Sequence, residues 1–258
     1  ELSEAIDLGV GTIVVDGFQE LDILNNIAKS KNANQGIMLR LSPSVDAHTH
    51  AHTTTGILDV KFGFSIETGE SSIAIKQALD SSNLTLQGIH FHLGSPIFEL
   101  EPYSTAIDTV FDYLRPFFLQ GLELKKFSPG GGFAIGYLQK QLPPSIGGYA
   151  DVITSMLKTK CDDLGIDYPE LIIEPGRSIV GRAGVAIYTV GVTKVIPNVR
   201  TYVSLDGGMG DNIRPALYEA QYEAVAANKM STTHFETVTL AGKYCETGDI
   251  LVKDVSLP

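Results

Sequence analysis

Short runs of apolar and β-branched residues alternate with longer segments of helical periodicity along most of the chain. Five runs have the length and composition of strands, at residues 12–15, 37–41, 86–91, 122–127 and 171–174. Among them lie segments whose apolar residues recur every three or four positions, as in amphipathic helices, at residues 21–28, 71–79, 104–119 and 149–164. A strand followed by a helix, repeated along the chain, predicts parallel βα units.

The rhythm changes after Arg177. Four further strands are predicted without regular helices between them, at residues 185–195, 200–205, 234–241 and 249–255. This pattern is typical of an all-β segment. We therefore predict an α/β chain in two parts, a partial (β/α)8 TIM-type barrel over residues 1–180 and a partial C-terminal β domain over residues 181–258.

The predicted barrel is incomplete at its start. A (β/α)8 barrel has eight strands, whereas five are visible here, and residues 1–9 already have the pattern of an amphipathic helix. We therefore expect about three βα units upstream and a natural N-terminus that lies outside this sequence. Leu257 and Pro258 end the chain without a closing helix or polar tail.

Composition and charge narrow the class of protein. The 258 residues are 43% hydrophobic and 19% charged, and no run approaches the roughly 18 apolar residues of a membrane span. The formal net charge of −11 argues against nucleic acid or an anionic membrane as partner, since both require clustered Lys and Arg. Cys161 and Cys245 lack CxxC spacing, so neither a disulfide framework nor a structural zinc site is expected. A cytoplasmic location follows as the expectation.

Candidate chemistry first appears at the end of the third predicted strand. Alternation places His90 and His92 on one face of that strand. The small-residue loop that follows, with Gly94 and Ser95, lets a ligand approach the backbone closely. For this segment alone, a pair of core histidines satisfied by their neighbours is an equal alternative.

A glycine-rich loop follows the fourth predicted strand. Gly130, Gly131 and Gly132 offer backbone N–H groups in conformations that residues with a Cβ avoid. Such loops bind phosphate without using charged side chains. An ordinary turn is the alternative, and the position at the end of a strand favours the phosphate site.

The fifth predicted strand ends in a carboxylate. Glu174 is followed by Pro175, Gly176 and Arg177. A carboxylate at the mouth of a cofactor-binding barrel could face a pyridine nitrogen and keep it protonated, because an opposing charge favours the charged form. A surface ion pair with the arginine is the alternative.

Two more candidates lie in the predicted β segment. Arg214 and Tyr218 follow the strand at 200–205, and Arg214 could bind a substrate carboxylate through two parallel hydrogen bonds, unless it is an exposed arginine in a β-turn. Cys245 stands beside Glu246 between the last two strands and could donate a proton while the carboxylate binds an ammonium group. Free cysteines are more often small buried hydrophobes.

One histidine cluster is not assigned a function. His48, His50 and His52 alternate as zinc ligands in a strand can, but they follow Ser42-Pro43 and precede Thr53-Thr54-Thr55-Gly56. This context predicts a loop. We therefore predict no metal site.

Taken together and in this order, the motifs resemble the diaminopimelate decarboxylase family, pyridoxal-phosphate enzymes with an alanine-racemase-like barrel. The resemblance runs from the first residue to the last and includes the segments 39–43, 61–63 and 226–229. Five ordered motifs are far more specific than any one of them.

The resemblance implies pyridoxal 5′-phosphate as cofactor, bound across the barrel mouth. His92 or His90 would lie against the ring, and Glu174 would pair with the pyridine nitrogen. The phosphate would be held by the backbone of Gly131 and Gly132 together with Gly176 and Arg177, and Ser95 would be a further cofactor-binding residue.

The resemblance also implies the substrate and the assembly. The reaction would remove carbon dioxide from the D-centre of meso-diaminopimelate and give L-lysine, with Arg177, Arg214 and Tyr218 gripping this amino-acid substrate. The enzyme would be a homodimer with shared active sites. Cys245 would reach in from the partner subunit to protonate the carbanion, and Glu246 would bind the far amino group.

Two departures from the family pattern bear on activity. The family's Schiff-base lysine lies on the first barrel strand, and no lysine of this sequence lies in the matching motif. A tyrosine that contacts the cofactor lies in strands beyond Pro258. We therefore expect this chain alone to be inactive and its parent protein to be active. A smaller departure is Gly210, where relatives often carry a larger polar residue, although the spacing to Arg214 is kept.

Two competing interpretations stay open. A decarboxylase of the same fold could act on ornithine, arginine or carboxynorspermidine, but ornithine enzymes resemble Cys followed by Asp, whereas Cys245 precedes a Glu. A regulatory pseudoenzyme that has lost its lysine is the non-catalytic alternative. A pseudoenzyme would not need to keep the phosphate-binding and substrate-binding groups that are all present here.

Overall fold

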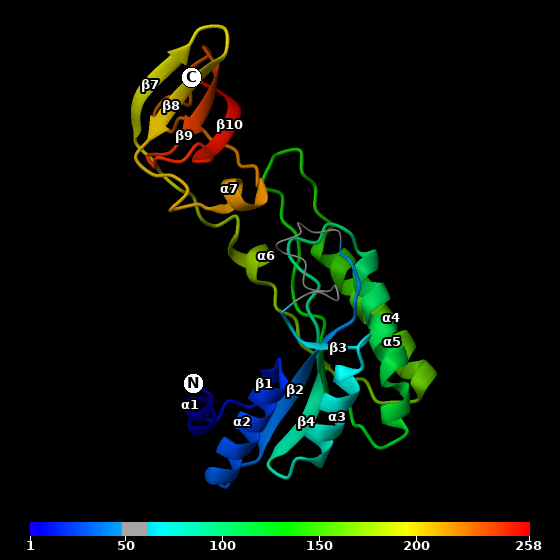
Figure 1. Ribbon diagram of the computed structural model, residues 1–258. Coiled ribbons are helices and arrows are strands. Elements are labelled where there is room, and N and C mark those ends of the chain that lie inside the picture. Colours follow the sequence, from blue (N-terminus) through cyan, green and yellow to red (C-terminus); the bar gives the residue numbers. More distant parts are fainter. Residues whose placement is uncertain (48–60) are drawn as a thin grey trace. The chain divides into compact units, whose positions relative to one another are not determined.

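The computed structural model describes residues 1–47 and 61–258 (Figure 1). The chain forms two compact units, one made of Glu1–Ala134 and Pro143–Ile179 and the other of Ile135–Leu142 and Val180–Pro258.

The segment Ile135–Leu142 was predicted to lie in the first domain, since the boundary was placed between residues 180 and 181. It instead belongs to the second unit. The backbone N–H of Gln139 donates to Glu223 Oε1 at 2.6 Å, and the rings of Tyr137 and Tyr222 lie 5.3 Å apart. These contacts join positions more than 80 residues apart, so no local pattern could have predicted them.

The first unit contains a parallel sheet in the order β1-β2-β4-β5-β6, with β3 paired to the end of β2. Apart from β3, strands that follow one another in the sequence are therefore neighbours in the sheet. A doubly wound sheet reverses its strand order at a switch point, and a barrel does not. The predicted parallel βα architecture is confirmed. Its strands are β1 (Ile13–Val15), β2 (Gln35–Ser42), β3 (Phe64–Ser65), β4 (Leu84–His90), β5 (Lys126–Ser128) and β6 (Glu170–Leu171).

The helices of this unit lie beside the sheet, with α2 and α3 next to β1, β2 and β4, and α4 alongside α5 (Figure 1). Apolar side chains from these helices and from the strands form one buried cluster. In α2, for example, Leu21, Leu24 and Ala28 occupy one helical face and are fully buried. The helices are α1 (Leu2–Asp7), α2 (Phe18–Ser30), α3 (Glu70–Asp80), α4 (Glu101–Phe118), α5 (Ile146–Leu164) and α6 (Gly176–Val180).

Two predicted strands are shorter than expected. The run at 122–127 belongs to a strand only at Lys126 and Phe127, where β5 begins, and the run at 171–174 only at Leu171, where β6 ends. Leu122 and Leu124 are buried in the core without belonging to a strand. A hydrophobic run indicates burial, whereas a strand also requires regular backbone pairing with a neighbouring strand. The length of the run therefore overestimates the length of the strand.

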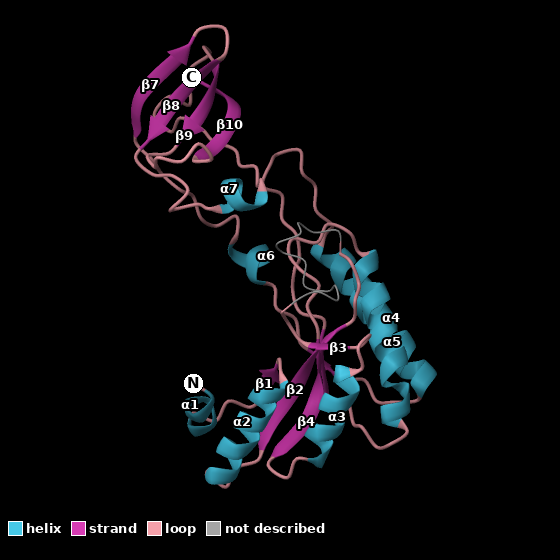
Figure 2. Ribbon diagram, in the orientation of Figure 1, coloured by secondary structure: helices cyan, strands magenta, loops and turns pink. Residues whose placement is uncertain are grey.

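The second unit contains a four-stranded sheet in the order β10-β9-β8-β7 (Figure 2). The pairs β7 with β8 and β9 with β10 are antiparallel, and β8 with β9 is parallel. Buried Leu205, Val238, Leu240 and Leu251 form its core. The strands are β7 (Val190–Ile196), β8 (Arg200–Leu205), β9 (Glu236–Ala241) and β10 (Ile250–Leu257).

The expectation of strands without helices between them needs one correction. The short helix α7 (Arg214–Tyr218) lies between β8 and β9 and has Pro215 in its first turn, where proline is well tolerated. Over the two described ranges, no helix is both long enough and apolar enough to cross a membrane.

Candidate active site

The carboxyl ends of neighbouring parallel strands collect polar side chains in the first unit. Arg40 lies near the end of β2, His90 ends β4, Ser128 ends β5, and Glu174 follows β6. Because these strands are parallel and adjacent, their carboxyl ends share one edge of the sheet. The βα topology therefore brings together side chains that are distant in the sequence.

Glu174 and His90 form the central contact of this edge. His90 Nε2 lies 3.0 Å from Glu174 Oε1, and the Ser128 hydroxyl donates to the same oxygen at 3.4 Å. The hydrogen bond from His90 holds the pKa of Glu174 below its ordinary value, although partial burial acts in the opposite direction. The Glu174 side chain is 50% exposed, so the edge presents an ionised and accessible carboxylate.

The two predicted histidines have different surroundings. His90 is buried, and its Nδ1 has no hydrogen-bond partner among the described residues. His92 Nδ1 accepts a hydrogen bond from the backbone N–H of Gly131 at 3.3 Å. Burial, together with the charge of Arg40, lowers the pKa of His92 to about 4, so His92 is neutral at physiological pH. His90 thus contacts the Glu174 carboxylate, and His92 contacts the glycine loop.

Arg40 and Asp16 were not predicted as site residues. Arg40 Nη1 lies 3.3 Å from Asp16 Oδ1, and the guanidinium stacks over the ring of Phe62 at 4.5 Å. Burial lowers the pKa of Arg40, which the charges of Asp16 and Glu174 partly offset. The signal that could have found Arg40 is its position at the carboxyl end of the strand predicted at 37–41.

The glycine loop, residues 130–132, is anchored through all three of its carbonyl groups. Gly130 O accepts from the Glu174 N–H at 3.0 Å, Gly131 O from the Tyr103 hydroxyl at 2.7 Å, and Gly132 O from the Ile97 N–H at 2.8 Å. The C=O and N–H groups of a trans peptide point in opposite directions. The N–H groups of Gly131 and Gly132 therefore point away from the first two anchors.

The loop requires glycine for steric reasons. Gly130 and Gly132 have φ values of +73° and +95°, which favour glycine. A Cβ on Gly131 would lie 2.0 Å from Glu174 O, and one on Gly132 would lie 2.4 Å from Gly94 O. The close backbone approach holds the loop against the strand ends.

The remaining predicted cofactor residues lie in the adjoining loops of the first unit. Ser95 is half-buried in the loop after β4, and Arg177 is half-buried in α6. The backbone N–H of Gly176 donates to Glu174 O at 2.9 Å. Their roles toward a phosphate stay predictions.

In the second unit, Arg214 and Tyr218 are the first and last residues of α7. Arg214 is half-buried rather than an exposed arginine in a β-turn. Its guanidinium carbon lies 5.3 Å from the Tyr218 ring and 5.9 Å from the Tyr137 ring, and its Nε donates to the Tyr222 hydroxyl at 3.0 Å. Tyr137 and Tyr222 were not predicted, and the approach of Tyr137 to Arg214 depends on the tertiary placement of residues 135–142.

Cys245 and Glu246 lie in the loop between β9 and β10, where both are exposed. The alternative of a small buried hydrophobe is therefore wrong for Cys245. It applies to Cys161, which is fully buried in the first unit, where burial raises its thiol pKa to about 11.

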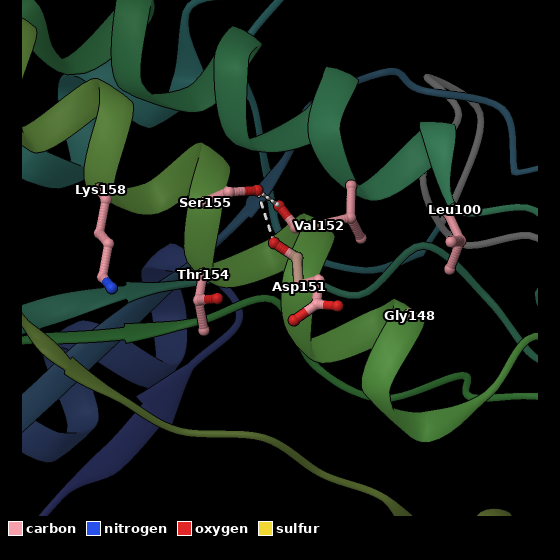
Figure 3. A pocket seen from close by; sticks show the side chains of 7 residues that line it. All are labelled: Leu100, Gly148, Asp151, Val152, Thr154, Ser155 and Lys158. Atoms are coloured by element: carbon pink, nitrogen blue, oxygen red, sulfur yellow. Dashed lines mark hydrogen bonds between the residues drawn. The ribbon is translucent and has the colours of Figure 1, made fainter.

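A surface pocket on the first unit is lined by residues of α5 and by Leu100, which precedes α4 (Figure 3). None of the predicted cofactor or substrate residues lines it, so we assign it no role in the chemistry. His48, His50 and His52 lie outside the described residues. Within residues 1–47 and 61–258, no three His, Cys, Asp or Glu side chains are grouped to hold a metal ion.

Comparisons with known proteins match the chain to one family. Residues 1–181 match the family described as "Pyridoxal-dependent decarboxylase, pyridoxal binding domain". The chain is 44% identical over 259 residues to a diaminopimelate decarboxylase of Bacillus subtilis, covering 100% of this chain and 59% of that protein. It therefore spans less than two thirds of this relative's length.

Solved structures show the same fold. Diaminopimelate decarboxylase from Helicobacter pylori, complexed with L-lysine, is 30% identical with a TM-score of 0.86 over 100% of this chain and 61% of that chain. Diaminopimelate decarboxylase from M. jannaschii, in co-complex with L-lysine, is 32% identical with a TM-score of 0.88 over 99% of this chain and 58% of that chain. The predicted fold class, part of an α/β barrel followed by a β domain, is confirmed.

Proposed function

The chain belongs to the pyridoxal-dependent decarboxylases, and from this premise we propose that the whole protein converts meso-diaminopimelate to L-lysine and carbon dioxide. This would be the last step of lysine biosynthesis. The observation that carries the proposal is the ionised, half-exposed carboxylate of Glu174 beside an anchored glycine loop at the strand ends. The identity to diaminopimelate decarboxylases over the full chain supports the substrate.

The residues at the strand ends fit pyridoxal phosphate. The Glu174 carboxylate suits a protonated pyridine nitrogen, because an opposite charge favours the charged form of the ring. The N–H of Gly132 points away from the carbonyl anchor of Gly131, which suits an anion such as phosphate, whereas the Gly131 N–H is donated to His92 Nδ1 and would bind phosphate only by leaving that partner. The buried Nδ1 of His90, with no partner among the described residues, is a polar atom that a bound ligand could satisfy.

We assign roles to these residues on that basis. Glu174 would keep the ring nitrogen protonated, and the neutral His92 would lie against the ring next to the glycine loop, with His90 orienting Glu174. The phosphate would be held by Ser95, Gly131, Gly132, Gly176 and Arg177. When bound, the cofactor accepts the electron pair that the departing carboxylate leaves on the α-carbon.

The second unit would supply the groups that bind the substrate, together with Arg177. The Nε of Arg214 is engaged by Tyr222, so its terminal nitrogens would bind the substrate carboxylate in two parallel hydrogen bonds. Tyr218 would line the same site. Exposed Cys245 would donate a proton to the α-carbon, and Glu246 would bind the distant ammonium group.

We further propose that the protein is a cytoplasmic homodimer, with Cys245 and Glu246 acting in the active site of the partner subunit. Both residues are exposed in a loop of the second unit, which leaves them accessible to another chain. A reactive thiol of this kind requires a reducing compartment.

The test is made on the full-length protein with pyridoxal phosphate. An absorbance band of the bound cofactor, with carbon dioxide released from meso-diaminopimelate and not from ornithine, is the expected result. Release from ornithine alone would replace the proposed substrate. The absence of both band and release would indicate a non-catalytic protein that keeps the fold.

A further inference from the structure

Asp249 is a buried carboxylate that joins two loops of the second unit. It lies just before β10 and is 2% exposed. Its Oδ1 accepts a hydrogen bond from the backbone N–H of Met209 at 2.6 Å, and its Oδ2 accepts one from the N–H of Tyr244 at 2.8 Å. The first loop, residues 207–211, leads to Arg214, and the second, residues 242–249, carries Cys245 and Glu246.

The backbone of Asp249 closes the second loop on itself. Its N–H donates to Glu246 O at 3.0 Å, and its carbonyl accepts from the Gly242 N–H at 2.8 Å. A third bond, from the Lys243 N–H to Gly207 O at 3.0 Å, connects the two loops directly. Cys245 and Glu246 therefore lie in a turn that is closed by the backbone hydrogen bonds of Asp249.

Glycines leave room for this carboxylate. A Cβ on Gly242 would lie 2.2 Å from Asp249 Oδ2, and a Cβ on Gly208 would lie 2.6 Å from the same oxygen. Contacts this short cannot be made by a real Cβ, so any larger residue at either position would displace the carboxylate. One glycine from each loop thus lies beside the Asp249 carboxylate.

Backbone N–H groups take the place of a counterion. Within the described residues, no Lys, Arg or His side chain forms an ion pair with Asp249. A buried carboxylate without a cation is costly unless its oxygens accept well-placed hydrogen bonds. The carboxylate therefore enforces a fixed position of the Met209 and Tyr244 amides relative to each other.

We propose that Asp249 is a positioning residue that holds the Cys245–Glu246 loop in register with the loop leading to Arg214. The proposal rests on the proposed function, in which these three side chains act on the substrate. In a dimer with shared sites, the two loops of one chain would serve different active sites. Loss of Asp249 would then disturb substrate binding at one site and proton donation at the other.

The test compares Asp249→Asn with Asp254→Asn in the full-length holoenzyme. Asn keeps the shape of Asp249 but cannot accept at both positions, so one buried N–H loses its partner. Asp254 is a matched control on β10, where it pairs with Arg200 at 3.2 Å and touches neither loop. Both variants are first checked for dimer mass and for the absorbance of bound cofactor.

Two measurements follow. The first is the rate of alkylation of Cys245 by N-ethylmaleimide, quantified by mass spectrometry of the peptide that contains it. We expect at least about a fivefold faster rate in D249N, because the loop loosens, and a rate close to wild type in D254N. The second is steady-state kinetics, in which we expect D249N to lower kcat and raise KM, with kcat/KM at least about tenfold lower.

An alkylation rate and a kcat/KM in D249N equal to those of D254N would overturn the inference. If D249N fails to bind cofactor or to dimerise, hydrogen exchange of the wild-type holoenzyme decides, since slow exchange of the Met209 and Tyr244 amides is expected and fast exchange contradicts it. If the wild-type protein does not act on meso-diaminopimelate, the proposed function fails. The alkylation and exchange results still decide the role of Asp249 in holding the loop.

Discussion

His90, which ends β4, and His92, two residues later, have different chemical surroundings. His90 is bound to a carboxylate at 3.0 Å, whereas His92 accepts a hydrogen bond from the glycine loop at 3.3 Å. The pKa of His92 falls to about 4 through burial and through the nearby charge of Arg40. A neutral imidazole can accept the Gly131 N–H, and a protonated one cannot.

This difference predicts a pH dependence of stability. The folded-state pKa of His92 is about 4 and its ordinary value 6.5, so the unfolded chain binds this proton more readily between those values. The contribution of neutral His92 is present above pH 6.5 and is lost as pH falls toward 4, by up to about 3 kcal/mol. His92→Asn should flatten this fall in the free energy of unfolding, measured by urea denaturation of the cofactor-free full-length protein.

The control for this prediction is His234→Asn, which changes an exposed histidine in the second unit. It should retain the wild-type pH dependence. The pKa of Glu174 is also lowered, but from an ordinary value of 4.5, so its effect falls mainly below the window in which His92 acts. Identical slopes for wild type and His92→Asn between pH 5 and 6.5 would contradict the assignment.

At the scale of elements, the glycine loop links β5 to the loops that follow β4 and β6. Gly131→Ala would place a Cβ 2.0 Å from Glu174 O, so the loop must shift. We expect the free energy of unfolding to fall by roughly 1–3 kcal/mol and the affinity for pyridoxal phosphate to fall with it. Thermal denaturation and cofactor titration measure the two effects.

Gly147→Ala is the matched control for the loop variant. Its Cβ would meet no atom closer than 3.8 Å, in the first turn of α5. Its stability should stay within about 0.5 kcal/mol of wild type. Equal behaviour of the two alanine variants would show that the close approach seen at Gly131 carries no cost.

Helices α4 and α5 are joined by a lysine with two carboxylate partners. Lys160 of α5 forms ion pairs with Asp108 and Asp112 of α4, the latter at 2.8 Å, and its side chain is 10% exposed. Burial alone would lower its pKa, but the hydrogen bonds to the two aspartates outweigh burial and raise it. Removing the lysine leaves two half-exposed carboxylates close together without a cation.

Lys160→Ala should therefore lower the free energy of unfolding by roughly 1–3 kcal/mol. Lys158→Ala removes an exposed lysine of the same helix (Figure 3) and should change stability by less than about 0.5 kcal/mol. Chemical denaturation of both variants makes the comparison. A Lys160 variant as stable as the Lys158 variant would mean that the ion pairs are fully offset by desolvation.

At the scale of the whole molecule, the proposed dimer predicts complementation between two inactive variants. Glu174→Gln removes the group proposed to face the cofactor, and Cys245→Ala removes the thiol proposed to act as proton donor in the site of the partner subunit. After unfolding and refolding as a mixture, half of the dimers are mixed and each has one intact site, so about a quarter of wild-type activity should return. A mixture no more active than the separate variants would place both groups in the site of one subunit.

Several candidate site residues could be predicted from the sequence because they lie at or just after the carboxyl ends of strands. His90 ends β4, the glycines follow β5, and Glu174 follows β6. Parallel strands align their carboxyl ends, so a strand boundary read from the sequence already places the next residue at the common edge. Arg40 of β2 is paired in register with His90 of β4, and it was missed because its strand was read only for its apolar residues.

Other site residues had no local signal. Tyr103 reaches the glycine loop across 28 positions, and Tyr137 lies near Arg214 because residues 135–142 belong to the second unit. A tyrosine in an amphipathic helix looks the same in the sequence whether its hydroxyl anchors a functional loop or faces solvent. Asp249 is a similar case, since an acidic residue after a turn is usually exposed and here is buried.

Local sequence patterns were enough to predict the order and type of the main elements, the change from βα units to a β domain, and the candidate residues at the strand ends. Hydrophobic periodicity and turn residues act over a few positions, and the geometry of parallel strands extends them to a common edge. The folded structure was needed to show which histidine contacts Glu174, which tyrosines lie near Arg214, and that Asp249 joins two loops. These depend on which distant side chains meet and how much water they lose, and neither quantity is encoded in local spacing.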